Sequence, residues 1–138
     1  IDPQLILHCK QSYPNSVFVT SDCYSIPLDS KKFDTVVMCM IIEHLKNPVH
    51  ALTEAKRLLK PGGNIVVVVP RKDDWFYRFI VKKDPTHVRE YNVVEISDLL
   101  RTVFTIENIC FGSVSTKVPS FLTWFLKPDI IINCKKDN

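Results

Sequence analysis

One stretch of the sequence decides the fold class, and it reads Leu59-Lys60-Pro61-Gly62-Gly63-Asn64-Ile65-Val66-Val67-Val68-Val69-Pro70. A Pro-Gly-Gly turn is followed by five consecutive apolar residues, which is typical of a strand buried on both faces. Pro70 has no N–H group to offer a sheet, so we expect the strand to end there. Such a strand lies in a parallel sheet covered by helices, and the stretch therefore indicates an α/β fold.

The residues before this stretch predict a strand and then a helix. Residues 35–40 are mostly apolar and predict the strand. Asn47 suits the N-cap of a helix and Pro48 suits its first position. Lys60 lies in the expected last turn, and the following Pro61-Gly62 ends the helix. Strand, helix and strand in this order predict a βαβ unit with two parallel strands.

The second half of the chain continues this alternation. Asn92 with Glu95 three residues later resembles a capping box and predicts the start of another helix. Further strands are predicted at residues 17–19, 105–110 and 129–134. Two stretches are rich in aromatic residues. Residues 71–83 predict either a lid over an acceptor site or a surface helix, and the aromatic residues within 119–128 are interpreted as core.

The overall composition limits the class of protein. With 138 residues, 46% of them hydrophobic, the chain can form a single domain over residues 1–138. Its net charge of +3 is small and evenly spread, so a nucleic-acid partner is not favoured. No apolar stretch approaches the roughly 18 residues that a membrane span requires. We therefore expect a cytoplasmic protein with no membrane span.

The glycines and cysteines exclude several kinds of site. None of the three glycines precedes Gly62, so the chain contains neither a G-x-G-x-x-G turn nor a P-loop. The five cysteines are scattered without any C-x-x-C pair, which favours reduced thiols over a disulfide framework or a zinc knuckle. The sequence predicts no metal site.

One acidic residue lies where an α/β sheet binds ligands. Asp22 follows the strand predicted at residues 17–19, and ligands of open α/β sheets bind at the carboxyl ends of strands. Its carboxylate can accept a hydrogen bond from an exocyclic amine such as that of adenine, while the Cys23 N–H donates to the neighbouring ring nitrogen. Asp22 can equally cap the next turn of the chain. The sequence leaves both interpretations open.

Four motifs together carry a family resemblance, and they occur in order over roughly residues 17–70. They are Asp22 with Ile26-Pro27-Leu28, then Phe33-Asp34, then Glu43-His44-Leu45, and finally Leu59-Lys60-Pro61-Gly62-Gly63. In this combination the sequence resembles the class I S-adenosylmethionine-dependent methyltransferases, particularly the branch that contains quinone-biosynthesis and many small-molecule enzymes. A nicotinamide dehydrogenase is set aside because the last motif has no role there.

The resemblance implies a fold and a cofactor site. It implies a Rossmann-like, mostly parallel seven-stranded sheet of order 3-2-1-4-5-7-6 with an antiparallel last strand. It implies that Asp2 binds the ribose hydroxyls of S-adenosylmethionine and that Asp22 and Cys23 bind the adenine. Asp2-Pro3 is also an ordinary helix start, so Asp2 can equally cap the helix that follows. The backbone near Met38 would face the methionine portion. The first strand and its glycine-rich turn have no counterpart in the sequence, so we expect the chain to be an N-terminally truncated fragment.

The resemblance also implies an activity and a catalytic residue. The expected reaction moves a methyl group from S-adenosylmethionine to a small-molecule acceptor such as a quinone, sugar or lipid. A general base is needed only for an acceptor that is protonated at neutral pH, and His87 is the first candidate. His44 is expected mainly to pack and to orient the following helix. The alternative function is a non-catalytic binding or regulatory module with the same fold.

Overall fold

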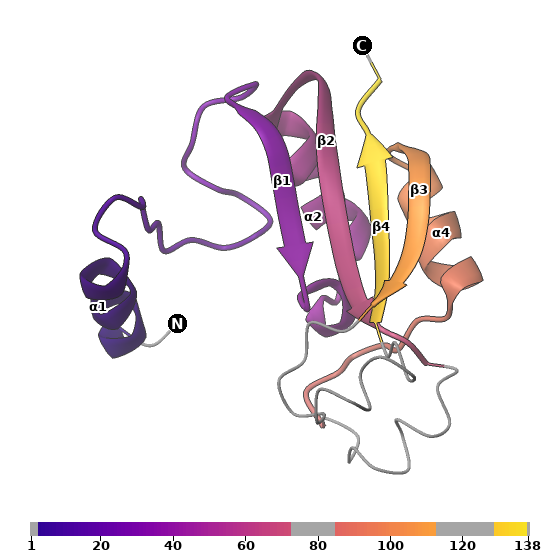
Figure 1. Ribbon diagram of the computed structural model, residues 1–138, viewed down its shortest axis with the longest axis horizontal. Helices are drawn as coiled ribbons and strands as arrows, with labels where there is room; N and C mark the ends of the chain where they lie inside the picture. Colours follow the sequence, from indigo (N-terminus) through magenta and orange to yellow (C-terminus); the bar gives the residue numbers. More distant parts are fainter. Residues whose placement is uncertain (1–2, 73–84, 113–128, 138) are drawn as a thin grey trace.

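The computed structural model describes residues 3–72, 85–112 and 129–137, and these contain a four-stranded sheet of order β1-β2-β4-β3 (Figure 1). The strands are β1 (Phe33–Cys39), β2 (Leu59–Pro70), β3 (Thr105–Gly112) and β4 (Asp129–Lys135). β1 and β2 are parallel, whereas β4 is antiparallel to both of its neighbours, β2 and β3. The final strand therefore inserts between two earlier ones and reverses direction, which confirms the expected antiparallel last strand.

The sheet order matches one half of the expected seven-stranded sheet. The order β1-β2-β4-β3 corresponds to the terminal 4-5-7-6 of the expected arrangement. The strand predicted at residues 17–19 is wrong, because these residues form no strand and Val17 is 89% exposed. A strand requires neighbouring backbone to receive its hydrogen bonds, and no strand within the described ranges pairs with these residues.

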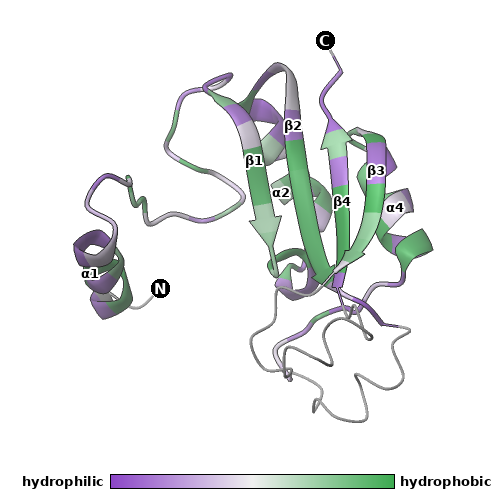
Figure 2. Ribbon diagram, viewed as in Figure 1, coloured by the Kyte–Doolittle hydropathy of each residue, from purple (hydrophilic) through white to green (hydrophobic). Residues whose placement is uncertain are grey.

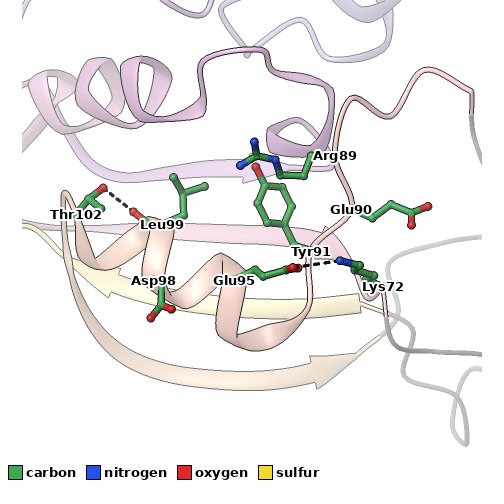
Figure 3. A pocket seen from close by; sticks show the side chains of 8 residues that line it. All are labelled: Lys72, Arg89, Glu90, Tyr91, Glu95, Asp98, Leu99 and Thr102. Carbon is green, nitrogen blue, oxygen red and sulfur yellow. Dashed lines mark hydrogen bonds and ion pairs between the residues drawn. The ribbon is translucent and has the colours of Figure 1, made fainter.

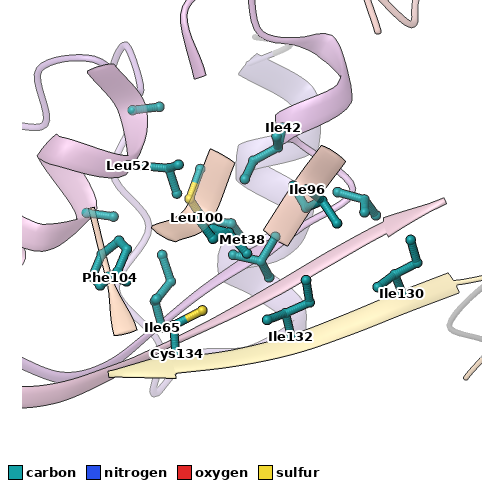
Figure 4. Packing of buried hydrophobic residues seen from close by; sticks show 14 of the residues in the cluster. Met38, Ile42, Leu52, Ile65, Ile96, Leu100, Phe104, Ile130, Ile132 and Cys134 are labelled. Carbon is teal, nitrogen blue, oxygen red and sulfur yellow. The ribbon is translucent and has the colours of Figure 1, made fainter. Parts of the chain in front are cut away.

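The hydrophobic core lies between one face of the sheet and two helices. The helices are α2 (Pro48–Leu58) and α4 (Val93–Arg101). Alternate residues of β2 and β4 point into the core, among them Ile65, Val67 and Ile132, each with no exposed surface (Figure 4). The apolar lengths of β2 and β4 run along the middle of the sheet (Figure 2). The apolar run of β2 thus forms a strand, as the sequence predicts, and among the described elements α2 and α4 cover one face of the sheet rather than the expected two.

Both predicted helix starts are confirmed by side-chain caps. The Asn47 side chain accepts a hydrogen bond from the His50 N–H at 3.3 Å. The Asn92 side chain accepts from the Glu95 N–H at 2.8 Å, and the Glu95 carboxylate accepts from the Asn92 N–H at 2.9 Å, which completes the capping box. The end predicted for the first of these helices is wrong. α2 stops at Leu58, and Lys60 already belongs to β2.

The N-terminal helix α1 (Pro3–Ser12) stands apart from the sheet and is joined to it by a long connection (Figure 1). Apolar Leu5 and Leu7 of this helix are 56% and 58% exposed. No helix in the described part of the chain has the length and hydropathy needed to cross a membrane. Asp2, most of the 71–83 segment and all of the 119–128 segment fall outside the described residues, so their predicted roles remain predictions.

Candidate active site

A tight turn at the carboxyl end of β1 directs the chain toward the candidate site. Met40 adopts a left-handed backbone conformation with φ of 53°, which is unfavourable for a residue other than glycine. Its N–H donates to the Val68 carbonyl at 2.9 Å, so the turn is tied to the neighbouring strand β2. The short 3-10 helix η1 (Ile42–His44) follows directly. Glu43 and His44 therefore lie at the edge where parallel α/β sheets bind ligands.

The structure brings the two candidate histidines together. The rings of His44 and His87 meet edge to face with centroids 4.8 Å apart. Glu43 lies beside them, with its carboxylate Oε1 4.0 Å from Nε2 of His44. Glu43 is only 1% exposed, whereas both histidines are partly exposed. A buried carboxylate and two accessible imidazoles thus share one corner of the molecule, and we call Glu43, His44 and His87 the Glu-His-His cluster.

Two sets of hydrogen bonds hold this cluster in place. The backbone carbonyl of Glu43 accepts from the N–H groups of Val88 and Arg89 at 2.9 and 3.1 Å. Nδ1 of His44 lies 3.2 Å from the carbonyl oxygen of Thr86 and 3.1 Å from its hydroxyl. The segment carrying His87 is therefore fixed against η1 on both sides. Glu43 and Thr86 were missed by the sequence reasoning, because their partners lie about forty residues apart.

Asp22 stabilises a tight turn by accepting hydrogen bonds from the residues that follow it. Its Oδ1 accepts from the Tyr24 N–H at 2.9 Å, and its carbonyl accepts from the Ser25 N–H at 3.2 Å. The capping interpretation of Asp22 is therefore confirmed. The side chain stays exposed, and its carboxylate has two oxygens with several acceptor positions. Capping the turn leaves acceptor capacity for a ligand, so both interpretations of Asp22 are compatible.

The other two residues predicted to bind the cofactor, Cys23 and Met38, can each contribute only backbone atoms. Cys23 is half-buried, and burial together with the neighbouring Asp22 charge raises the pKa of its thiol. The thiol therefore remains protonated at neutral pH, and only the backbone of Cys23 suits the predicted role. The side chain of Met38 is 6% exposed and packs in the core (Figure 4), so again only its backbone can face a ligand.

A polar network fastens the segment after Asp22 to α2. The Arg57 guanidinium donates to both oxygens of Glu54 at 2.7 and 2.8 Å, and to the carbonyls of Ile26 and Leu28 at 2.9 and 2.8 Å. Glu54 also accepts from the Ile26 N–H at 2.7 Å. Hydrogen bonds from Arg57 and from the Ile26 backbone lower the pKa of Glu54 to about 2. The i,i+3 spacing of Glu54 and Arg57 in the sequence predicts that the two side chains pair on one face of a helix. It does not predict that the pair also binds the loop at residues 26–28.

Tyr24 provides a second link between this turn and α2. Its hydroxyl oxygen accepts from the Asn47 N–H at 3.2 Å, and its ring stacks on His50 with centroids 5.3 Å apart. The turn at Asp22 is thus held at the start of the helix that follows η1. His50 is exposed, and so is His8 on α1.

A shallow depression of about 590 Å³ lies beside α4, and Lys72, Arg89, Glu90, Tyr91, Glu95, Asp98, Leu99 and Thr102 line it (Figure 3). Lys72 pairs with Glu95 at 3.1 Å, and Glu95 also belongs to the capping box. Tyr91 is 2% exposed, and burial raises the pKa of its hydroxyl. The Lys72–Glu95 ion pair and the capping box hold the start of α4 in place. We therefore assign the depression a structural role.

Comparison with known proteins agrees with the geometry. A family model described as a methyltransferase domain matches residues 1–67. A probable S-adenosylmethionine-dependent methyltransferase of Mycolicibacterium smegmatis is 30% identical over 108 residues, which cover 78% of this chain and 42% of the relative. The demethylmenaquinone methyltransferase of Renibacterium salmoninarum is 33% identical over 58 residues, covering 42% of this chain and 24% of the relative.

A solved structure extends the likeness over nearly the whole chain. The N-methyltransferase NodS from Bradyrhizobium japonicum, in complex with S-adenosyl-l-homocysteine, matches 99% of this chain and 64% of its own with a TM-score of 0.67 at 14% identity. This likeness shows the Rossmann-like methyltransferase fold. The chain spans less than half the length of the two curated relatives. The family match, the four sequence motifs and the sheet order agree, and each makes the chain similar to the class I S-adenosylmethionine-dependent methyltransferases.

Proposed function

We propose that the protein carrying this chain transfers a methyl group from S-adenosylmethionine to a small-molecule acceptor. The observation that carries the proposal is the β1-β2-β4-β3 sheet with a histidine cluster at the carboxyl end of β1. Ligands of α/β folds bind at this edge. The proposal is supported by the names of the relatives and by the S-adenosyl-l-homocysteine bound to NodS.

The residues present fit the proposed cofactor. Asp22 offers an exposed carboxylate in a turn that hydrogen bonds make rigid, and the Cys23 backbone lies next to it. These two residues would hold the adenine, Asp2 would hold the ribose hydroxyls, and the backbone near Met38 would lie along the methionine portion. When bound, the cofactor supplies a sulfonium methyl group that is already strongly electrophilic. The protein mainly has to orient the acceptor, because proximity and alignment supply much of the rate.

His87 is the proposed general base. It is partly exposed and lies at the same edge of the sheet as the end of β1. A neutral imidazole can accept a proton from an acceptor hydroxyl or amine. His44 donates through Nδ1 to the Thr86 carbonyl and packs against the His87 ring, so its role is to position His87.

The acceptor is proposed to be a small molecule of the kind that quinone-biosynthesis enzymes use. The match to demethylmenaquinone methyltransferase supports this class. The alternative proposal is a non-catalytic module that binds S-adenosylmethionine without turning it over. One measurement distinguishes the methyltransferase from the non-catalytic module, namely the formation of S-adenosylhomocysteine in the presence of a panel of quinone and other acceptors. Only the enzyme would form this product.

Calorimetry on the intact protein tests the cofactor site. Asp22→Asn keeps a side-chain oxygen that can cap the turn but removes the negative charge, so the variant should fold and bind S-adenosylhomocysteine about tenfold more weakly. The matched control is Asp29→Asn, which changes an exposed carboxylate that pairs only with Lys32 across 3.4 Å among the contacts described. Its affinity should stay within about twofold of the starting value. Absence of binding heat in the unaltered protein would refute the proposed function.

A further inference from the structure

We propose that Glu43, His44 and His87 bind a divalent transition-metal ion at the carboxyl end of β1. The three side chains each offer one ligand atom, and these atoms all lie within 4.8 Å of one another. Two imidazole nitrogens and one carboxylate oxygen form a donor set that suits zinc, iron, cobalt or manganese better than calcium. The sequence predicts no metal site from its cysteine pattern, and the adjacent Glu43 and His44 meet His87 only in the folded chain.

His44 is oriented as a metal ligand requires. A donating Nδ1–H is the arrangement that satisfies the Thr86 carbonyl, 3.2 Å away. That tautomer leaves the lone pair on Nε2, the atom that faces Glu43 Oε1 across 4.0 Å. Metal-binding histidines characteristically donate their second ring nitrogen to a backbone carbonyl or carboxylate, which fixes the ring. Thr86 therefore has the position of an outer partner that sets the ligand orientation.

Glu43 contributes a buried carboxylate to the cluster. Its side chain is 2% exposed, and a buried ionised carboxylate is stabilised by positive charge close to it. A divalent ion bound by the cluster would add to the positive charge beside Glu43. The histidine side of the cluster remains open, with the His44 side chain 35% exposed, so an ion can reach the site from solvent. The cluster thus combines a buried anionic ligand with an accessible entrance.

The spacing of the cluster requires only a small adjustment. Ligand atoms arranged tetrahedrally at zinc-like bond lengths lie roughly 3.4 Å apart. The side chains of His44 and His87 would therefore close on Glu43 by about 1 Å, a movement available to partly exposed rings. The backbone is already fixed, because Val88 and Arg89 donate to the Glu43 carbonyl at 2.9 and 3.1 Å. Three protein ligands leave further coordination positions open to water or an acceptor.

An ion at this place would change the role of His87, a consequence that rests on the proposed function. A nitrogen lone pair that binds metal cannot accept a proton. The ion would instead lower the pKa of a coordinated acceptor hydroxyl, which then loses its proton to solvent. The same corner of the molecule would serve methyl transfer by orienting and polarising an oxygen acceptor.

The test is calorimetric titration of Zn²⁺ and Co²⁺ into the intact, chelator-treated protein without any S-adenosylmethionine. We expect one ion to bind per chain, and His87→Asn and Glu43→Gln each to weaken binding at least about tenfold. His8→Asn is the matched control, because His8 is exposed on α1 and outside the cluster. Cys39→Ser is the thiol control, because Cys39 is exposed at the end of β1. Both control variants should bind like the unaltered protein.

Three results would overturn the proposal: no saturable binding, unchanged affinity in His87→Asn and Glu43→Gln, or loss of binding in Cys39→Ser. Circular dichroism melting of each variant checks the fold. If Glu43→Gln does not fold, His44→Asn replaces it, since that side chain is partly exposed. The measurement is independent of the cofactor, so metal binding without S-adenosylhomocysteine binding would refute only the proposed function, and the reverse would refute only the metal site.

Discussion

Two regions of the molecule use similar apolar residues with opposite outcomes. The sheet region, residues 33–72 with 85–112 and 129–137, contains every buried member of the hydrophobic core. The N-terminal region, residues 3–32, leaves its large apolar side chains at the surface, with Tyr13 63% and Val17 89% exposed. Cys23 and Tyr24 are the members of this region that pack against the core. Apolar composition therefore does not make a core unless neighbouring elements are present to receive it.

The largest expected effect tests this contrast directly. Leu100 on α4 has no exposed surface, so Leu100→Ala should lower the free energy of unfolding by about 3 kcal/mol through lost burial and the cavity left behind. Val17→Ala changes an 89% exposed side chain and should cost less than about 0.5 kcal/mol. Denaturant unfolding of both variants measures the difference. Equal costs would mean that Val17 is buried in solution and that the two regions are not distinct.

A second prediction concerns the link between the regions. Glu54→Gln weakens the hydrogen bonds to Arg57 and to the Ile26 N–H, and should cost about 2 kcal/mol at neutral pH. The folded-state pKa of Glu54 is about 2, below its ordinary 4.5, so its ionised form stabilises the fold above pH 4.5. That stabilisation is lost as the pH falls from about 4.5 toward 2.

Thermal melting across this pH range measures the effect. The unaltered protein should lose stability steeply between pH 4.5 and 2, whereas Glu54→Gln should show a flatter acid limb. Parallel curves would show that the carboxylate does not hold residues 26–30 to α2. Limited proteolysis sharpens the same point, because the variant should be cleaved faster within residues 26–30 than within the sheet region.

The smallest expected effect lies within the sheet region. Asn92→Ala removes the N-cap of α4 and should cost about 1 kcal/mol in denaturant unfolding. Asp98→Ala, on the same helix, removes only the exposed ion pair with Arg101 at 3.0 Å and should cost less than about 0.5 kcal/mol. A cost for Asn92→Ala no larger than that of the control would indicate that packing alone holds α4.

The candidate site was only partly predictable from sequence. Asp22 was predicted from a sequence motif and His87 from the family resemblance, and the roles of both remain predictions. Their surroundings could not be predicted, because the Asp22 turn depends on Tyr24 reaching Asn47, and the His87 segment depends on backbone donors reaching the Glu43 carbonyl. Met38 is a strand position near the site whose side chain packs in the core, so only its backbone could serve the predicted role. Motifs locate a residue along the chain but do not give its direction.

The sequence by itself determined the helices, their caps and the strands of the sheet region, because capping residues and apolar periodicity act over a few neighbouring residues. It also carried the family resemblance, through four motifs in order. Only the tertiary structure decided that residues 17–19 are not a strand, that α2 ends before Lys60, and that Glu43, His44 and His87 meet. Strand pairing and side-chain clusters depend on contacts between residues far apart in the chain, and these exist only once the chain has folded.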